Sequence, residues 1–189
     1  ANEPISIYDY STGEFIDWPV NFDGSSGGTL PLVQAVQRSI NVVPAQLMEI
    51  IGPEQSFYFL RDKLGMHSLV SPEEASEHNG QHDMLMSPMT LGGMAEGVTP
   101  LEMAGAYTIF VNGGKFVEPY CYTHVYDSDG NLLLEKDTKQ VRVISEETST
   151  IINKLLQMVV QAAPGTGTTA NLAPMPTAGK TGTSSEDYD

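Results

Sequence analysis

Four consecutive residues near the end of the chain combine an ammonium group, two hydroxyls and a glycine: Lys180, Thr181, Gly182 and Thr183. On an extended strand, side chains alternate between two faces, so Lys180 and Gly182 would share one face and the threonines the other. Because Gly182 has no side chain, a ligand can approach the backbone closely there. This combination suits the binding of a carboxylate with an oxyanion beside it.

Two nucleotide-binding motifs compete for the same region. Gly179-Lys180-Thr181 matches the end of a P-loop, but that loop needs a glycine where Pro174 stands. Residues 165–170 (GTGTTA) match a loose dinucleotide-binding pattern, which must follow a strand and open a helix. Here a predicted helix precedes it and two prolines follow. We therefore reject both motifs and expect no cofactor.

The triplet Ser39-Ile40-Asn41 lies at a tight junction between two predicted helices. Its simplest interpretation is structural: Ser39 ends the first helix and Asn41 caps the second. Such triplets are common by chance, so this one gains meaning only from what accompanies it.

Metal ligation and cysteine chemistry have weaker support. His78 and His82 are four residues apart, but an Asn-Gly pair between them breaks a helix and no third ligand follows from the pattern. A calcium loop after residue 126 fails because Leu132 and Thr138 stand where glycine and glutamate are needed. We expect no metal site. Cys121, the only cysteine, is expected to be a buried structural thiol.

Composition limits the function classes. With 189 residues, 40% of them hydrophobic, the chain can bury a core of its own. A net charge of -15 disfavours nucleic acid and anionic lipid surfaces as partners. No apolar run is long enough to span a membrane, and the N-terminal residues are too polar for a signal peptide.

Apolar spacing and capping residues predict mainly helices in the first part of the chain. Thr29 is expected to cap the first helix, and Thr99 with Glu102 forms a capping box. Helices are expected over about 29–39, 41–51, 53–64, 99–111 and 145–162, the last capped by Ser145. Residues 1–28 and 66–98 are expected to be irregular. Two strands, 116–126 and 132–143, should form a hairpin around Asp129-Gly130.

A serine-x-asparagine triplet at a helix junction, with Lys-Thr-Gly-Thr more than a hundred residues later, is typical of penicillin-binding proteins and serine β-lactamases. The wider sequence resembles the transpeptidase domain of class A (bifunctional) penicillin-binding proteins. The resembling stretches are residues 19–24 (PVNFDG), 32–44 (LVQAVQRSINVVP), 91–114 (LGGMAEGVTPLEMAGAYTIFVNGG), 165–167 and 178–183. β-Lactamases usually have aspartate where this chain has Ile40, which favours the penicillin-binding protein.

The resemblance implies an α+β fold of the penicillin-binding protein and serine β-lactamase type, present here as a partial transpeptidase domain over 1–189. Its expected parts are an irregular lead-in, a helical lobe, a β-hairpin, a helix with a loop, and one truncated strand of the main sheet. These cover residues 1–28, 29–114, 115–144, 145–176 and 177–189. An unpaired strand edge at 177–183 is expected either to pair with a second copy or to be poorly ordered.

The implied activity is that of a serine-type D-Ala-D-Ala transpeptidase, an acyltransferase that cross-links peptidoglycan in cell-wall synthesis and is the target of β-lactams. By resemblance, Ser39 relays a proton, Asn41 orients the substrate amide, and Lys180, Thr181 and Thr183 hold the terminal carboxylate. The backbone N–H of Thr183, beside Gly182, would form half of the oxyanion hole. The expected partners are peptidoglycan stem peptides and β-lactams, at the extracytoplasmic face of a bacterial membrane, with an anchoring helix outside this sequence.

The chain departs from the family pattern in one respect. None of its six lysines has a serine three residues earlier, so the Ser-x-x-Lys nucleophile motif is absent. We therefore expect an internal fragment of a transpeptidase domain that cannot be acylated by itself. The alternatives are a non-catalytic penicillin-binding-like scaffold or interaction module, and a serine β-lactamase-like hydrolase.

Overall fold

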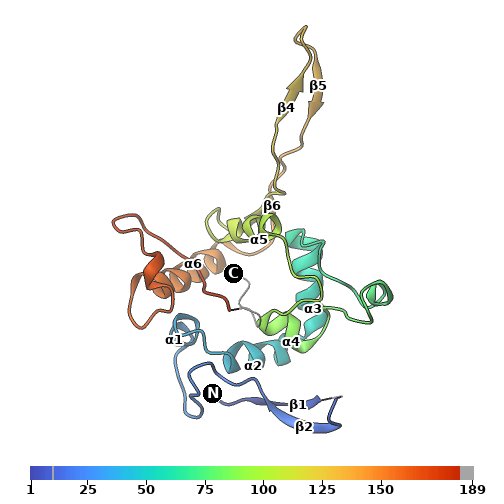
Figure 1. The fold of residues 1–189 in the computed structure, drawn as a ribbon. Helices are drawn as coiled ribbons and strands as arrows, with labels where there is room; N and C mark the ends of the chain where they lie inside the picture. Colours follow the sequence, from blue (N-terminus) through green and yellow to red (C-terminus); the bar gives the residue numbers. More distant parts are fainter. Residues whose placement is uncertain (10, 184–189) are drawn as a thin grey trace.

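The computed structural model describes residues 1–9 and 11–183, a mixed α and β arrangement (Figure 1). The α-helices are α1 (Leu32–Gln37), α2 (Val42–Ile51), α3 (Pro53–Tyr58), α4 (Met86–Leu91), α5 (Pro100–Tyr107) and α6 (Glu146–Gln161). A π-helix, η1 (Phe59–Lys63), continues α3, and short 3-10 helices are η2 (Ala75–Glu77), η3 (Thr108–Phe110) and η4 (Thr168–Ala170). In this part of the chain, no helix has the length and apolar character needed to cross a membrane.

The strands of the described residues pair as three antiparallel ribbons. These are β1 (Ile5–Asp9) with β2 (Glu14–Trp18), β3 (Lys115–Phe116) with β6 (Val141–Arg142), and β4 (His124–Tyr126) with β5 (Leu132–Glu135). The β3–β6 and β4–β5 pairs form the hairpin predicted from the sequence, which projects from the body of the molecule in Figure 1. Asp127 closes its turn by accepting hydrogen bonds from the backbone N–H groups of Asp129 and Asn131, at 2.9 and 2.8 Å.

Two hydrophobic clusters hold the helices together. The larger one surrounds Phe57 of α3, which is fully buried, and it joins α4 to the α5–η3 segment. Its other buried members are Leu64, Met66, Leu69, Met89, Ala106 and Ile109. The smaller cluster consists of Ala35, Ile40 and Val42, so it lies directly beneath the junction of α1 and α2. The Ser-x-Asn triplet is therefore attached to a packed core through its middle residue.

The predicted helix starts are confirmed at two positions where a capping side chain precedes the helix. The Thr99 hydroxyl accepts from the backbone N–H of Glu102, whose carboxylate accepts from the Thr99 N–H, so the predicted capping box is confirmed. Ser145 caps α6 by accepting from the N–H of Thr148 at 3.1 Å, also as predicted. Thr29 is wrong as a cap, because α1 begins after Pro31 and has no side-chain cap.

Several predicted irregular regions are wrong. Residues 1–28 contain the β1–β2 hairpin, in which the rings of Tyr8 and Phe15 pack edge to face across the strands at 5.3 Å. Gly13, with φ of 75°, permits the turn between them. Residues 66–98 contain α4, which buries Met89 in the larger cluster. The packing of Met89 supports α4, whereas the β1–β2 hairpin pairs two neighbouring segments and is mostly exposed.

Two further corrections concern exposed segments. Cys121 is exposed, because it lies at the base of the projecting hairpin and not in a buried strand. The predicted strand at 177–183 is wrong, since in the described residues it pairs with no other strand. It lies instead against α6, where the Gly179 N–H donates to Leu156 O at 3.3 Å. A strand needs a hydrogen-bonded neighbour, and no described strand lies beside this segment.

Candidate functional site

Lys180 and Ser39, which are 141 residues apart, meet in the structure. The Lys180 ammonium Nζ donates a hydrogen bond to the Ser39 hydroxyl Oγ at 2.7 Å. It also donates to the backbone carbonyl of Thr181 at 3.1 Å. The Ser-x-Asn and Lys-Thr-Gly-Thr motifs therefore form one site, joined by a hydrogen bond between their side chains.

Burial alters the chemistry of Lys180. Desolvation of the half-buried side chain lowers the pKa of its ammonium group from the ordinary value of 10.5. A lysine whose proton is held less tightly, and which is hydrogen-bonded to a hydroxyl, can exchange a proton with that hydroxyl more readily. While it remains protonated, the same group supplies a fixed positive charge for an anionic ligand.

The backbone presents Ser39 in an unusual conformation. Its φ of 55° lies in the left-handed region, which few residues other than glycine adopt. Ile40 N–H donates to Ala35 O, and Ser39 N–H donates to Val36 O, which together form a Schellman motif at the end of α1. Ser39 occupies the position in that motif where glycine is usual, and buried Ile40 provides the hydrophobic contact that accompanies it. Strain of this kind is frequent where a side chain must be aimed at a ligand.

This strain predicts that Ser39→Gly is more stable than Ser39→Ala, the reverse of the order expected from helix propensity. Ser39→Ala and Ser39→Gly both remove the hydroxyl, but only glycine adopts the left-handed conformation without steric cost. We expect Ser39→Gly to unfold with a free energy about 1 kcal/mol higher than Ser39→Ala in urea titrations. Helix propensity alone favours alanine, so equal stability, or a more stable Ser39→Ala, would show that the turn is unstrained.

Asn41, predicted as the cap of α2, does not cap it. Its backbone is helical, and its side-chain amide donates to Val20 O at 2.9 Å. The cap comes from Asn21, whose Oδ1 accepts from the N–H groups of Asn41 and Val42 at 2.9 and 3.1 Å. Asn21 is buried and also donates to Asn2 Oδ1 and Ser25 O. The segment before α1 therefore fixes the loop that carries Ser39.

The remaining predicted residues face outward beside Lys180. Thr181 and Thr183 are exposed, and the Thr181 hydroxyl lies 2.8 Å from that of Thr166 in the loop after α6. Apart from atoms of the two adjoining residues, no described atom lies within 4 Å of the position that a side chain would take on Gly182. The backbone is thus open to a ligand at this point. Ser184, which follows, lies outside the described residues.

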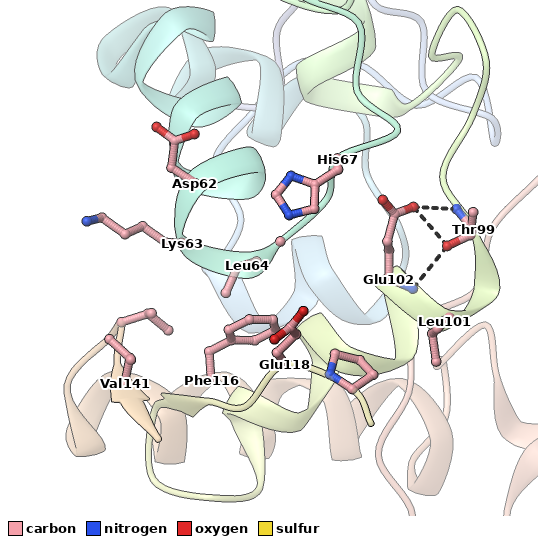
Figure 2. A pocket seen from close by; sticks show the side chains of 13 residues that line it. Asp62, Lys63, Leu64, His67, Thr99, Leu101, Glu102, Phe116, Glu118 and Val141 are labelled. Carbon is pink, nitrogen blue, oxygen red and sulfur yellow. Dashed lines mark hydrogen bonds between the residues drawn. The ribbon is translucent and has the colours of Figure 1, made fainter. Parts of the chain in front are cut away.

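A separate pocket of about 540 Å³ lies between η1, the start of α5 and the base of the hairpin (Figure 2). In Figure 2, Phe116 lies below His67, and Glu102 is bound to Thr99. None of the predicted site residues lines it. Two of its carboxylates are engaged, Glu102 by Ser68 and Thr99 and Glu118 by Lys136, and Asp62, Lys63 and His67 add further polar groups. Because neither motif of the candidate site contributes a residue to this pocket, we assign no function to it.

The histidines considered for metal binding are placed apart from any ligand set. His78 Nδ1 lies 2.9 Å from Glu96 Oε1, which forms a local pair in an exposed loop. Within residues 1–9 and 11–183, no group of three histidine, cysteine, aspartate or glutamate side chains could hold a metal ion.

The profile of the penicillin binding protein transpeptidase domain matches residues 1–188. The chain belongs to this family. Penicillin-binding protein 1A of Clostridium botulinum is 36% identical over 178 residues, which are 94% of this chain and 20% of that protein. The resemblance to class A penicillin-binding proteins is thereby confirmed. This transpeptidase-domain chain spans about a fifth of the length of the curated 1A relatives it matches.

Solved structures agree with the assignment of the fold. The D,D-transpeptidase domain of a peptidoglycan glycosyltransferase from Eggerthella lenta superposes with a TM-score of 0.64 at 22% identity, over 96% of this chain and 47% of that one. Penicillin binding protein 3 from Mycobacterium tuberculosis, complexed with aztreonam, gives 0.62 at 25% identity, over 90% of this chain and 39% of that one. The fold is therefore the mixed α and β fold of the family, present over part of those chains.

Sequence reasoning missed two buried polar residues on either side of Ser39, Asn21 and Gln37. Asn21 lies within the stretch 19–24 that carried the family resemblance. The sequence therefore marked this residue, but it did not indicate that Asn21 caps α2. Gln37 lies within the stretch 32–44, which also carried the resemblance, but its contacts with Met158 and Ala162 could not be predicted, because these partners are 121 and 125 positions away.

Proposed function

We propose that the complete protein is a serine-type DD-transpeptidase that cross-links peptidoglycan, and that this chain supplies the wall of its active site that binds the substrate carboxylate. The observation that carries the proposal is the 2.7 Å contact between Lys180 Nζ and Ser39 Oγ. It joins the two family motifs of this sequence in one place, as a proton relay and an anion site require.

In the proposed reaction, a serine outside this sequence attacks the carbonyl of the D-Ala-D-Ala peptide bond. Its hydroxyl proton passes through Ser39 to the leaving nitrogen of D-alanine, and the acyl group remains on the serine as an ester. An amine of a second stem peptide then takes the acyl group and loses a proton, which restores the serine hydroxyl. The backbone N–H of Thr183 stabilises the oxyanion that forms in both steps.

The other residues act on substrate binding. Lys180 and the hydroxyls of Thr181 and Thr183 hold the terminal carboxylate through charge-assisted hydrogen bonds, which contribute about 1.5–3 kcal/mol when a charged group takes part. Asn41 orients the substrate amide, which requires its side chain to exchange Val20 O for the substrate. β-Lactams would occupy the same groups, and the protein would act at the outer face of the bacterial membrane. The open segment at 177–183 is a further candidate for contact with a second copy of this chain.

The test is intact-mass spectrometry after incubation with a penicillin. We expect no stable adduct on this 189-residue chain, and an acyl adduct on a longer form of the protein that contains a Ser-x-x-Lys motif. In the longer form, Lys180→Ala should slow acylation about tenfold to a hundredfold, while Lys154→Ala, on the exposed side of α6, should not. A stable adduct on this chain would refute the assignment of the nucleophile.

The same measurement separates the alternatives. A longer form without a Ser-x-x-Lys motif that takes up no penicillin would support the scaffold. An adduct that is rapidly hydrolysed would support the β-lactamase-like hydrolase.

A further inference from the structure

The C-terminal turns of α6 contact both halves of the site. On one side, Gln37 of α1 donates from Nε2 to Ala162 O at 2.8 Å and to Met158 O at 3.2 Å. On the other side, Gln161 Nε2 donates to Thr177 O at 3.0 Å, three residues before Lys180. The helix end is thus a common platform for the segment that carries Ser39 and the segment that carries Lys180.

Gln37 is suited to this contact by chemistry as well as by position. The last carbonyl groups of a helix have no partner within the helix, so they accept from any donor that reaches them. Gln37 is buried, with 4% of its surface exposed, and its amide donates to one carbonyl of the last turn, that of Met158. It also donates to the carbonyl of Ala162, the residue just after α6, which accepts from the Gly165 N–H as well. Its own backbone carbonyl accepts from the N–H of Thr166, at 3.2 Å, in the loop that follows α6.

The contact bears on the position of Ser39 because the amide of Gln37 forms the side-chain hydrogen bonds between α1 and the end of α6 in the described residues. The cluster around Ile40 and the Arg38–Asp23 ion pair hold the same region from other sides. This helix has only six residues, no side-chain cap and no ion pair with α6 among the described residues. Gln37 is its last helical residue, and Ser39 follows two residues later on the rigid Schellman turn. A shift of α1 relative to α6 would therefore move the Ser39 hydroxyl relative to Lys180.

The Lys180 side is held to the same platform by independent contacts. Gly179 N–H donates to Leu156 O, and the Thr181 hydroxyl pairs with that of Thr166. Because Thr166 N–H also binds Gln37 O, this loop links the two motif segments directly. One connected set of hydrogen bonds thus joins the segments of Ser39 and Lys180, and Gln37 contributes the only buried side chain of that set in the described residues.

We propose that Gln37 is a positioning residue of the site, whose amide clamps α1 to the end of α6 and so holds Ser39 Oγ within hydrogen-bond distance of Lys180 Nζ. Its meaning for catalysis rests on the proposed function. The contact itself does not, because the pKa of Lys180 can be measured in this chain without any acylation.

The test compares two glutamine-to-methionine variants, which keep side-chain length and remove the amide. Gln37→Met breaks the clamp, whereas Gln157→Met removes a hydrogen bond to Asn153 within α6 itself. We expect NMR titration, with the chain folded, to show the pKa of Lys180 rising toward 10.5 in Gln37→Met, because the freed side chain becomes better hydrated. In Gln157→Met the pKa should stay unchanged.

A purely structural role for Gln37 would lower the melting temperature in Gln37→Met without moving the pKa of Lys180, and that result would overturn the proposal. If Gln37→Met does not fold, the unmodified chain decides. The side-chain amide protons of Gln37 should exchange with solvent more slowly than those of exposed Gln161, and equal rates would refute the clamp. Both measurements use this chain alone. If the longer protein failed to be acylated, the proposed function would be refuted, but the pKa and exchange results would still decide the role of Gln37.

Discussion

Replacement of Asn21 by alanine is expected to lower the free energy of unfolding by about 2–4 kcal/mol. The variant removes the acceptor of two backbone N–H groups, those of Asn41 and Val42, at the start of α2. A buried donor left without a partner costs about 1–3 kcal/mol, because it gave up water on folding and gains nothing in return. Urea denaturation of the chain and the variant measures the difference.

Asn21→Asp is the matched control for this effect. It keeps oxygen acceptors for both N–H groups, and a negative charge is favourable at a helix N-terminus, but it loses the amide that donates to Asn2 and Ser25. We expect it to lose less than half as much stability as Asn21→Ala. If the alanine variant were as stable as the aspartate variant, capping by Asn21 would contribute little.

Replacement of Phe57 by alanine should have a still larger effect, a loss of about 3–5 kcal/mol in the free energy of unfolding. The ring is fully buried at the centre of the larger cluster, and Arg61 lies over its face, 5.8 Å from the ring centre. Truncation removes that contact and leaves a cavity between α3, α4 and α5 that rigid neighbours fill only in part. Calorimetry or urea denaturation gives the value.

Phe22→Ala provides the same chemical change on the surface, where 68% of the ring is exposed. Its stability should stay within about 0.5 kcal/mol of the unmodified chain, because little apolar surface leaves the interior. A loss for Phe57→Ala similar to that for Phe22→Ala would mean that the cluster around Phe57 does not act as a core.

Local signals predicted the parts of the fold that short-range interactions determine. The capping box of Thr99 and Glu102, the Ser145 cap and the turn at Asp129-Gly130 each place donor and acceptor within four residues. Because both partners of each hydrogen bond lie close together in the sequence, the pattern of residue types identifies them. The β1–β2 hairpin was missed because its strands are short, and α4 was missed because it is short and packs against distant residues of the larger cluster.

At residues 177–183 the sequence predicted a strand that the structure does not contain. The residue types of this segment predicted a strand, but strand structure depends on a neighbour that the segment cannot supply for itself. In the described residues it is held by α6 instead, through Gly179 and Thr177. Its conformation was predicted wrongly because residue type is a local property, whereas strand pairing depends on a second segment.

By itself, the sequence determined which groups are available: the hydroxyl of Ser39, the ammonium of Lys180, and the family whose motifs contain them. Only the tertiary structure decided that these two groups lie 2.7 Å apart, that Asn21 caps α2 in place of Asn41, and that Gln37 binds the end of α6. The difference arises from the distance along the sequence over which each kind of interaction acts. Residue type and capping act over a few positions, whereas a contact between residues 141 positions apart depends on how buried surfaces and unsatisfied helix ends meet.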